Sequence, residues 1–457
     1  MKKGKIVGLI AGVVIALLIM AVPIEGLSPE GKKALALTIM CVVFWSANVM
    51  QSGYVACVFI ALALLTGTAD AATVFGTWLK STLWMMMAAF LIAGAVVDSG
   101  LAERIANYAT VKIVRDWKSL ILFILVMLVV LGLLVPNTMA RCFIVFAIVK
   151  RIAENNGFKH EDVVKLGFAT FALGCPTQSI FLTGEGTLNQ LVLSVSGLQI
   201  GWFEWLLVCG VPCIVASIVM TLLILALFKP EGDISIDVEK TRARLDEMGA
   251  LSSNEKRMIV WLVLLVAFWM TDKIHGLDIT WGTMFFIALM SLPVVGELVG
   301  PKTWSQIPVN ILFFCTGAMA IGSVGGATGM NQWIAETLLP ASIGNNIFVM
   351  GAIILVITTI LHMVLGSQLT TFAVVVPLIL AYTADMGINP VVVTMLVFTS
   401  VSMHFLLPFH ALPVTVGMDP GGFSNKETLR LGIPMTVAIF VLGVLVFIPW
   451  WQLLGYV

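Results

Sequence analysis

Uncharged apolar runs of 17 to 20 residues recur along this chain, and they limit its possible folds more than any other feature. The run from Ser119 to Val135, for example, contains no charged residue over 17 positions. Runs of this length cross the hydrocarbon core of a bilayer as helices, and none shows the alternation of a barrel strand. The composition agrees, with 60% hydrophobic residues, 11% charged residues and a mean hydropathy of +1.05. We predict an all-α polytopic membrane protein.

The runs group into about 11 transmembrane helices and two re-entrant helical hairpins, at 119–149 and 346–383. Residues 1–33 hold the first span and its connection, because the apolar stretch after MKKGK is too long for a signal peptide. A cytoplasmic N-terminus and an extracytoplasmic C-terminus place most Lys and Arg in the cytoplasm, which predicts a multi-pass protein of the cell inner (plasma) membrane. The exceptions are Arg141 within the membrane and four outer lysines: Lys32, Lys33, Lys80 and Lys273.

Two segments about 229 residues apart, beginning at Trp84 and at Phe313, read alike as Gly- and Ala-rich helices that end in Ile-Ala. Each leads into a hairpin with a polar break. Each hairpin is followed by a helix interrupted by Gly, Pro and polar residues, at 161–200 and 391–416. Paired interrupted segments at corresponding places are typical of the binding site of a secondary transporter.

An odd number of predicted spans separates equivalent positions, so the second copy is inverted relative to the first. We therefore expect two inverted-topology repeats, 34–228 and 258–457. The segment between them, 229–257, mixes charges of both signs around an amphipathic centre. This pattern predicts a cytoplasmic linker with no catalytic role.

Three stretches carry a resemblance to a known family. They are PWWQLLG at 449–455, the pattern MAAFLIAGAVVDSGLAERIA in the fourth span, and the two hairpin tips, Pro136-Asn137-Thr138 and Ser367-Gln368-Leu369. Over nearly its whole length the chain resembles the divalent anion/sodium symporter family of dicarboxylate and citrate carriers and exchangers, whose tips carry Ser-Asn-Thr. The resemblance implies a homodimer with a fixed scaffold and a mobile transport domain of hairpins and broken helices, which moves substrate by an elevator motion.

A polar break at the midplane can hold an anion and a cation together. Its unpaired amides carry the positive end of a helix dipole, and its unpaired carbonyls attract sodium. No cofactor is expected besides sodium as a possible coupling ion, for which Asn137, Gly184 and Gln368 are the candidate ligands. The expected substrate-binding residues are Asn137, Thr138, Thr187, Asn189, Ser367, Gln368, Thr370, Thr371, Pro413 and Thr415.

Arg141 and Glu185 are charged residues beside these breaks, and a charge at membrane depth is costly unless it is paired. Arg141 either pairs inside the protein, with backbone carbonyls or with Glu185, or contacts a substrate carboxylate. Glu185 either balances Arg141, completes a cation site or carries a proton. The seven Cys and the apolar-segment histidines His362, His404 and His410 lack metal-ligand spacing, and we interpret them as core residues.

The sequence therefore predicts a secondary active transporter of small divalent anions, C4-dicarboxylates or citrate, driven by sodium symport. The alternative is a sodium-independent exchanger of one anion for another. The expected partners are the dianion, the lipid bilayer and a second copy of the chain, and no nucleic acid. An intramembrane enzyme would need a metal cluster or a nucleophile with its base, and the sequence contains no such motif. A channel, the third class considered, would conduct without a coupled gradient.

Overall fold

The computed structural model describes residues 2–47, 49–232, 234, 236–293, 295–305, 307–338, 346–366, 368–407 and 410–457. Every regular element within these ranges is a helix, as the sequence predicts. Among the described residues, five helices are long and apolar enough to cross a membrane: Gly4–Ala21, Trp117–Leu134, Trp202–Leu227, Val309–Ala327 and Asn425–Leu453. The bent pair Ala71–Leu79 and Leu83–Asp98 would make a sixth span, and other apolar helices are shorter. The chain is an all-helical polytopic membrane protein, while the count of about 11 spans stays a prediction.

The first half contains both predicted breaks, one between α7 and α8 and one between α9 and α10. Its first helices are α1 (Lys2–Ala21), α2 (Pro29–Ser46), α3 (Ser52–Leu65), α4 (Ala71–Phe75), η1 (Gly76–Leu79), α5 (Ser81–Asp98) and α6 (Leu101–Ile113). The hairpin and the broken helix follow as α7 (Trp117–Leu134), α8 (Thr138–Asn155), α9 (His160–Thr177), η2 (Leu182–Gly184) and α10 (Leu188–Ser196). The half ends with α11 (Trp202–Trp205), η3 (Leu206–Gly210) and α12 (Val211–Leu227).

The second half follows the linker helix α13 (Glu239–Glu247). It opens with α14 (Ser253–Met270), α15 (Asp272–His275), α16 (Ile279–Met290), α17 (Pro301–Trp304), α18 (Val309–Ala327) and α19 (Met330–Leu338). Its hairpin and broken helix are α20 (Ile347–Leu365), α21 (Gln368–Thr383), η4 (Ala384–Met386), α22 (Pro390–Met403) and α23 (Leu412–Gly421). It ends with α24 (Asn425–Leu442), η6 (Gly443–Phe447) and α25 (Ile448–Leu453).

Each half contains a helical hairpin followed by a broken helix, α7 to α10 in the first and α20 to α23 in the second. Helix α3 packs against α18, and α16 packs against α5, as reciprocal partners would if α3 corresponds to α16 and α5 to α18. Each half also ends in a long helix that contains a π-helical turn, η3 or η6. The two inverted-topology repeats stay a prediction.

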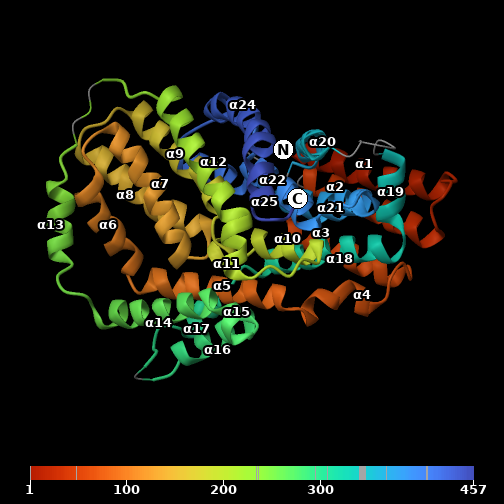
Figure 1. Cartoon of the computed structure of the whole chain (residues 1–457), viewed down its shortest axis with the longest axis horizontal. Coiled ribbons are helices and arrows are strands. Elements are labelled where there is room, and N and C mark those ends of the chain that lie inside the picture. Colours follow the sequence, from red (N-terminus) through yellow and green to blue (C-terminus); the bar gives the residue numbers. More distant parts are fainter. Residues whose placement is uncertain are drawn as a thin grey trace.

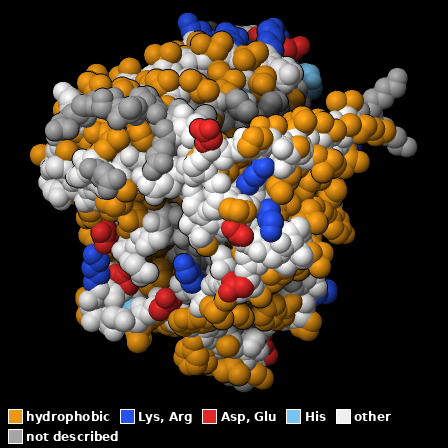
Figure 2. Space-filling view, turned by 90° about the vertical axis from the view of Figure 1, so that its right-hand side faces the viewer, with side chains coloured by type: hydrophobic (Ala, Val, Ile, Leu, Met, Phe, Trp, Pro, Cys, Tyr) orange, Lys and Arg blue, Asp and Glu red, His pale blue; other side chains and the backbone are white. Residues whose placement is uncertain are grey.

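The hairpin α7–α8 and helix α9 lie toward one end of the molecule with α6 and α13, and the elements α1, α2 and α19 to α21 lie toward the other (Figure 1). Hydrophobic side chains cover much of the face in Figure 2, and charged side chains form separate groups. In α1, Val7 is 65% exposed and Leu17 is 64% exposed. A surface this apolar is expected where lipid replaces water as the solvent.

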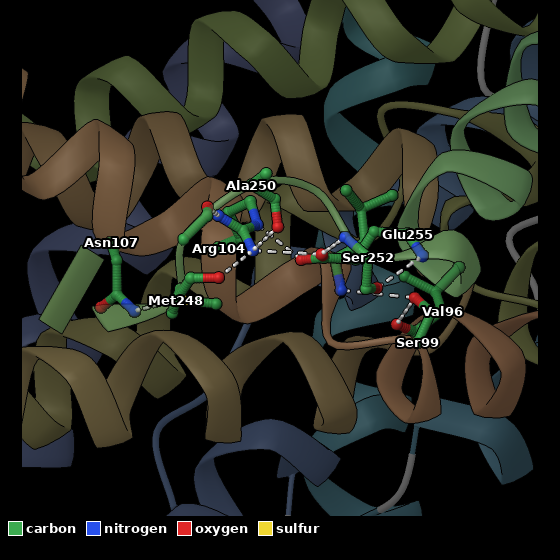
Figure 3. Close-up of polar contacts among 10 residues, drawn as sticks. Val96, Ser99, Arg104, Asn107, Met248, Ala250, Ser252 and Glu255 are labelled. Carbon is green, nitrogen blue, oxygen red and sulfur yellow. Dashed lines mark hydrogen bonds and ion pairs between the residues drawn. The ribbon is translucent and has the colours of Figure 1, made fainter. Parts of the chain in front are cut away.

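Arg104 on α6 fixes the segment that joins the halves (Figure 3). Its Nε and Nη2 donate to the carboxylate of Glu255, at 2.6 and 3.1 Å. Its Nη1 donates to the carbonyl of Gly249 at 2.8 Å, and its Nη2 donates to the carbonyl of Met248 at 3.0 Å. The hydrogen bond from Arg104 lowers the pKa of Glu255, which is only 3% exposed. One guanidinium therefore holds the end of the linker and the first turn of α14 against the first half.

Candidate functional site

The first hairpin tip is a three-residue break between α7 and α8. Helix α7 ends at Leu134, and Asn137 caps α8, with its side-chain oxygen accepting from the N–H of Ala140 at 2.9 Å. Pro136, which has no N–H to donate, stands between them and favours the break. Asn137 is therefore a helix cap in this structure, and contact of its amide with substrate stays a prediction.

Arg141, one helical turn into α8, ties this tip to the broken helix. Its side chain is fully buried, and its Nη1 donates to the carbonyls of Val135, at 2.9 Å, and of Gly184. Its Nη2 donates to the hydroxyl of Thr138 at 3.1 Å. Of the two roles considered, the geometry corresponds to pairing inside the protein through backbone carbonyls. These bonds offset the cost of burying the charge.

Glu185, just beyond η2, places its carboxylate at the start of α8. Its Oε2 accepts from the backbone N–H of Thr138 at 2.9 Å, and its Oε1 accepts from the N–H of Thr187 at 3.3 Å. The beginning of a helix stabilises a negative charge in this position. An internal carboxylate therefore sits where the sequence predicts a substrate carboxylate.

The second hairpin tip lies between α20 and α21. Gly366 adopts the left-handed conformation, with φ of 68°, that ends α20, and Ser367 falls outside the described residues. Gln368 Nε2 donates to the carbonyls of Val401 and Ser402, at 3.1 and 3.0 Å, and so joins the tip to the end of α22. Within the described part of the chain, three buried oxygens here have no hydrogen-bond partner: Gln368 Oε1, Thr370 Oγ1 and Ser402 Oγ.

Two of the predicted contact residues, Asn189 and Thr371, have partners inside the protein. The Asn189 side chain is fully buried, and its Nδ2 donates to the carbonyls of Gln178, Phe181 and Leu182, where α9 unwinds. The Thr371 hydroxyl lies 2.8 Å from Nδ1 of His362. These hydrogen bonds stabilise the chain next to the breaks.

A cavity of about 530 Å³ lies where the tips and the broken helices meet. This volume is typical of a small-molecule site. Eight of the predicted site residues line it: Asn137, Thr138, Glu185, Thr187, Gln368, Thr370, Pro413 and Thr415. Arg141, Gly184, Asn189 and Thr371 are not among the lining residues.

In the described part of the chain, four helices of the hairpins and broken elements begin at this cavity, two from each half, and α3 also begins there, with Ser52. The first residues of α8, α10, α21 and α23, which are Thr138, Leu188, Gln368 and Leu412, all line it. Each helix N-terminus is equivalent to about +0.5 elementary charge, so four of them offset roughly two negative charges. The cavity wall is therefore suited to a small dianion.

The rest of the wall comes from helices without breaks, and the sequence did not identify it. Trp45, Ser52, Phe90, Ile311 and Phe314 line the cavity from α2, α3, α5 and α18. These residues lie in uninterrupted apolar helices, and no local pattern marks them. Gln178, which also lines the cavity, does have a signal, because it follows Pro176 and Thr177 at the end of α9.

A family model described as the sodium:sulfate symporter transmembrane region matches residues 3–457 of the chain. The chain is also similar to the putative malate transporter YflS of Bacillus subtilis, with 24% identity over 66% of this chain and 65% of the relative. It is 26% identical to dicarboxylate transporter 1, chloroplastic, of Spinacia oleracea, over 72% of this chain and 60% of that protein.

Among solved structures, the fold is similar to that of the YdaH transporter of Alcanivorax borkumensis, whose topology is described as unusual. The TM-score is 0.54 with 12% sequence identity, and the match covers 90% of this chain and 98% of the other. The likeness concerns the fold alone.

Proposed function

Since the chain belongs to the sodium:sulfate symporter family, a family of membrane transporters, we propose that it is a secondary active transporter of small divalent anions. We propose C4-dicarboxylates or citrate as the substrate class. The names of two relatives support this choice, since they specify malate and dicarboxylates. The membrane is proposed to be the cell inner membrane, with the N-terminus in the cytoplasm.

The observation that carries this proposal is the convergence on one cavity of four N-termini from the hairpins and broken helices. A dianion placed there loses its water and gains the positive ends of four dipoles. The buried Arg141 and the carboxylate of Glu185 carry opposite charges, so together they add little net charge to the cavity wall. Two carboxylates at opposite ends of a short chain would face amides from both halves.

The remainder of the wall suits the carbon chain of such an anion. Phe90, Ile311 and Phe314 give an apolar surface on the side of the unbroken helices. Thr138, Thr187, Thr370 and Thr415 provide hydroxyls that can donate to carboxylate oxygens or accept from a substrate hydroxyl. Substrate contact by these threonines is part of the proposal.

Sodium symport is the proposed source of energy. The three unpartnered oxygens at the second tip, Gln368 Oε1, Thr370 Oγ1 and Ser402 Oγ, have the chemistry of sodium ligands. Gln368 therefore fits a cation site although it replaces the family's Asn. A sodium ion there would add positive charge beside the dianion and link the binding of the two.

The proposed motion is of the elevator type, in a homodimer. The hairpins and broken helices, from α7 to α10 and from α20 to α23, would move as one body. Helices α2, α3, α5 and α18 would form the fixed wall. The cavity between these two groups of helices supports the division.

Sodium-independent exchange is the second candidate, and one observation favours it. The guanidinium of Arg141 donates a hydrogen bond to the carbonyl of Gly184. The sequence predicts Gly184 as a sodium ligand at the first tip. A fixed cation there would remove the need for one coupling ion. The transport domain of an exchanger would return across the membrane only with a second anion bound.

Uptake of a radiolabelled C4-dicarboxylate into proteoliposomes tests both candidates, with liposomes lacking protein as the control. Symport predicts saturable uptake driven by an inward sodium gradient and not by an equal potassium gradient. Exchange predicts uptake only when the liposomes contain dicarboxylate, whatever the sodium gradient. If neither condition drives saturable uptake, the proposed function is wrong.

A further inference from the structure

Three histidines that are separated in sequence form one buried cluster beside the second hairpin. The ring centroids of His362 and His404 lie 5.3 Å apart, those of His362 and His410 also 5.3 Å, and those of His404 and His410 5.7 Å. His362 and His410 are fully buried, and His404 is 2% exposed. From the sequence we interpreted these histidines as separate core residues. The contacts that bring them together join the end of α20 to the break between α22 and α23, and no sequence pattern indicates them.

The hydrogen bonds distinguish the three rings. His410 Nδ1 accepts from the backbone N–H groups of Leu406, at 3.2 Å, and Leu407, at 3.3 Å, so this nitrogen already uses its lone pair. His362 Nδ1 lies 2.8 Å from the hydroxyl of Thr371. In the described part of the chain, both ring nitrogens of His404 are buried without a hydrogen-bond partner. His404 can therefore take up a proton without breaking a bond.

The surroundings of His404 favour a proton over a metal ion as its ligand. No group of three or more His, Cys, Asp or Glu among the described residues has the arrangement of a metal site. The titratable groups that face His404 there are His362 from α20 and His410 from the segment before α23. The neighbouring helix α21 contributes the hydroxyl of Thr371 to His362, and Gly432 of α24 lies close to the backbone of Phe405, which follows His404.

Two members of the cluster are close in sequence to residues of the cavity wall. His362 precedes Met363 in α20, and His410 precedes Leu412 at the start of α23; both Met363 and Leu412 line the cavity. In the first half, the corresponding junction of hairpin and broken helix holds the permanent charge of Arg141. In the second half, histidine rings occupy the junction, and one proton would add a positive charge there.

We propose that this cluster, with His404 as the acceptor, binds one proton together with the anionic substrate; the inference rests on the proposed function. An imidazolium enclosed this deeply is costly without a counter-charge, so proton binding waits for the dianion. By linkage, the proton strengthens dianion binding by the same factor, which is typically roughly five- to 150-fold. Transport would then carry a proton or depend on its presence.

Proton uptake on substrate binding tests the proposal directly. Purified full-length protein in detergent, weakly buffered near pH 7 with an indicator dye, is titrated with a C4-dicarboxylate whose carboxyl groups are both ionised. We expect about one proton to be taken up per dianion bound by the wild type and by His160→Asn, which alters an exposed histidine at the start of α9. We expect none with His404→Asn.

A second measurement uses dicarboxylate uptake into proteoliposomes between about pH 6 and about pH 8. The wild type should show a lower KM for the dianion in acid, and any uptake that remains in His404→Asn should lose this dependence. Dianion binding by the wild type without proton uptake overturns this inference alone, even if His404→Asn fails to insert. Full proton uptake by a folded His404→Asn overturns it too. No dianion binding at all overturns the proposed function and this inference with it.

Discussion

Glu185 shows how a single residue can fill a position that a sequence pattern assigns to the ligand. Its carboxylate accepts from the N–H of Thr138, at the start of α8, and it also lines the cavity. This internal anion partly balances the charge of Arg141. It also repels a dianion that approaches the same amides.

Replacing Glu185 by Gln keeps an acceptor oxygen for Thr138 and removes the negative charge. We expect the dianion to bind more tightly by about 1 kcal/mol or more, because a like charge has left the wall. Equilibrium binding of a radiolabelled dicarboxylate to purified protein measures this. Glu161→Gln, an exposed change in the first turn of α9, is the control. Weaker binding to the Gln variant would instead indicate that Glu185 holds a coupling cation.

Arg141→Lys separates pairing inside the protein from substrate contact. An ammonium keeps the charge but cannot reach two carbonyls and a hydroxyl at once, and each lost charged hydrogen bond costs about 1.5–3 kcal/mol. We expect a lower melting temperature and a KM for the dianion within about twofold of the wild type. A large rise in KM at an unchanged melting temperature would contradict this and place the guanidinium on the substrate.

At the scale of helices, the site depends on how each broken element starts and stops. Asn137 caps α8, Gln368 holds the end of α22, and Asn189 holds the end of α9. Three amide side chains thus replace the backbone bonds that the breaks remove. Lipid offers no hydrogen-bond partner at membrane depth, so the protein supplies these partners itself.

Asn137→Ser and Asn137→Ala test whether this cap also contacts the substrate. Serine caps a helix about as well as asparagine, whereas alanine costs about 0.5–2 kcal/mol. We expect both changes to reduce dicarboxylate uptake strongly, and only alanine to lower the melting temperature. Asn346→Ser, at the cap of α20, is the matched control. Normal uptake by Asn137→Ser would limit the role of Asn137 to capping.

The bond between Arg104 and Glu255 predicts acid sensitivity of the linker. Because Arg104 lowers the pKa of Glu255 in the folded chain, the stabilisation is present above the unfolded value of about 4.3 and is lost as pH falls through the folded value. We expect proteolysis of 229–252 to increase below about pH 4 in the wild type, and already at neutral pH in Glu255→Gln. The control variant is Arg244→Gln, which removes the exposed ion pair between Arg244 and Glu103. Equal cleavage of both variants at neutral pH would contradict the role of this pair.

At the scale of the whole molecule, the cavity lies between the broken helices and a wall of unbroken ones. The broken helix α10 contacts this wall where Ser194 Oγ donates to Met319 Sδ, at 3.4 Å, on α18. On the proposed elevator motion, this contact breaks in every cycle. Contacts within the wall do not change.

A disulfide across the moving boundary should therefore stop transport. We expect oxidised Ser194→Cys/Met319→Cys to lose uptake, to keep dianion binding, and to recover on reduction. The control pair Ser28→Cys/Thr328→Cys lies within the wall, where Ser28 Oγ donates to the carbonyl of Thr328 at 2.9 Å. Its crosslink should leave uptake unchanged. Full uptake by the crosslinked first pair would exclude relative motion of α10 and α18.

Both hairpin tips and both broken helices could be found in the sequence, and eight of the predicted residues meet in one cavity. The unbroken wall that includes Trp45, Phe90 and Phe314 could not be found, because an apolar residue facing a cavity reads like one facing lipid. The same holds for the histidine cluster. Its members lie in two separate elements with no shared spacing.

The sequence by itself determined the membrane class, the helical fold and the positions of the breaks. These properties are local, since run length and the need to satisfy backbone groups in lipid can be read residue by residue. Only the tertiary structure decided that Arg141 binds the carbonyl of Gly184 and that the Glu185 carboxylate occupies the start of α8. These partners are 43 and 47 residues apart, and only the packing of a hairpin against a broken helix sets the distance between them.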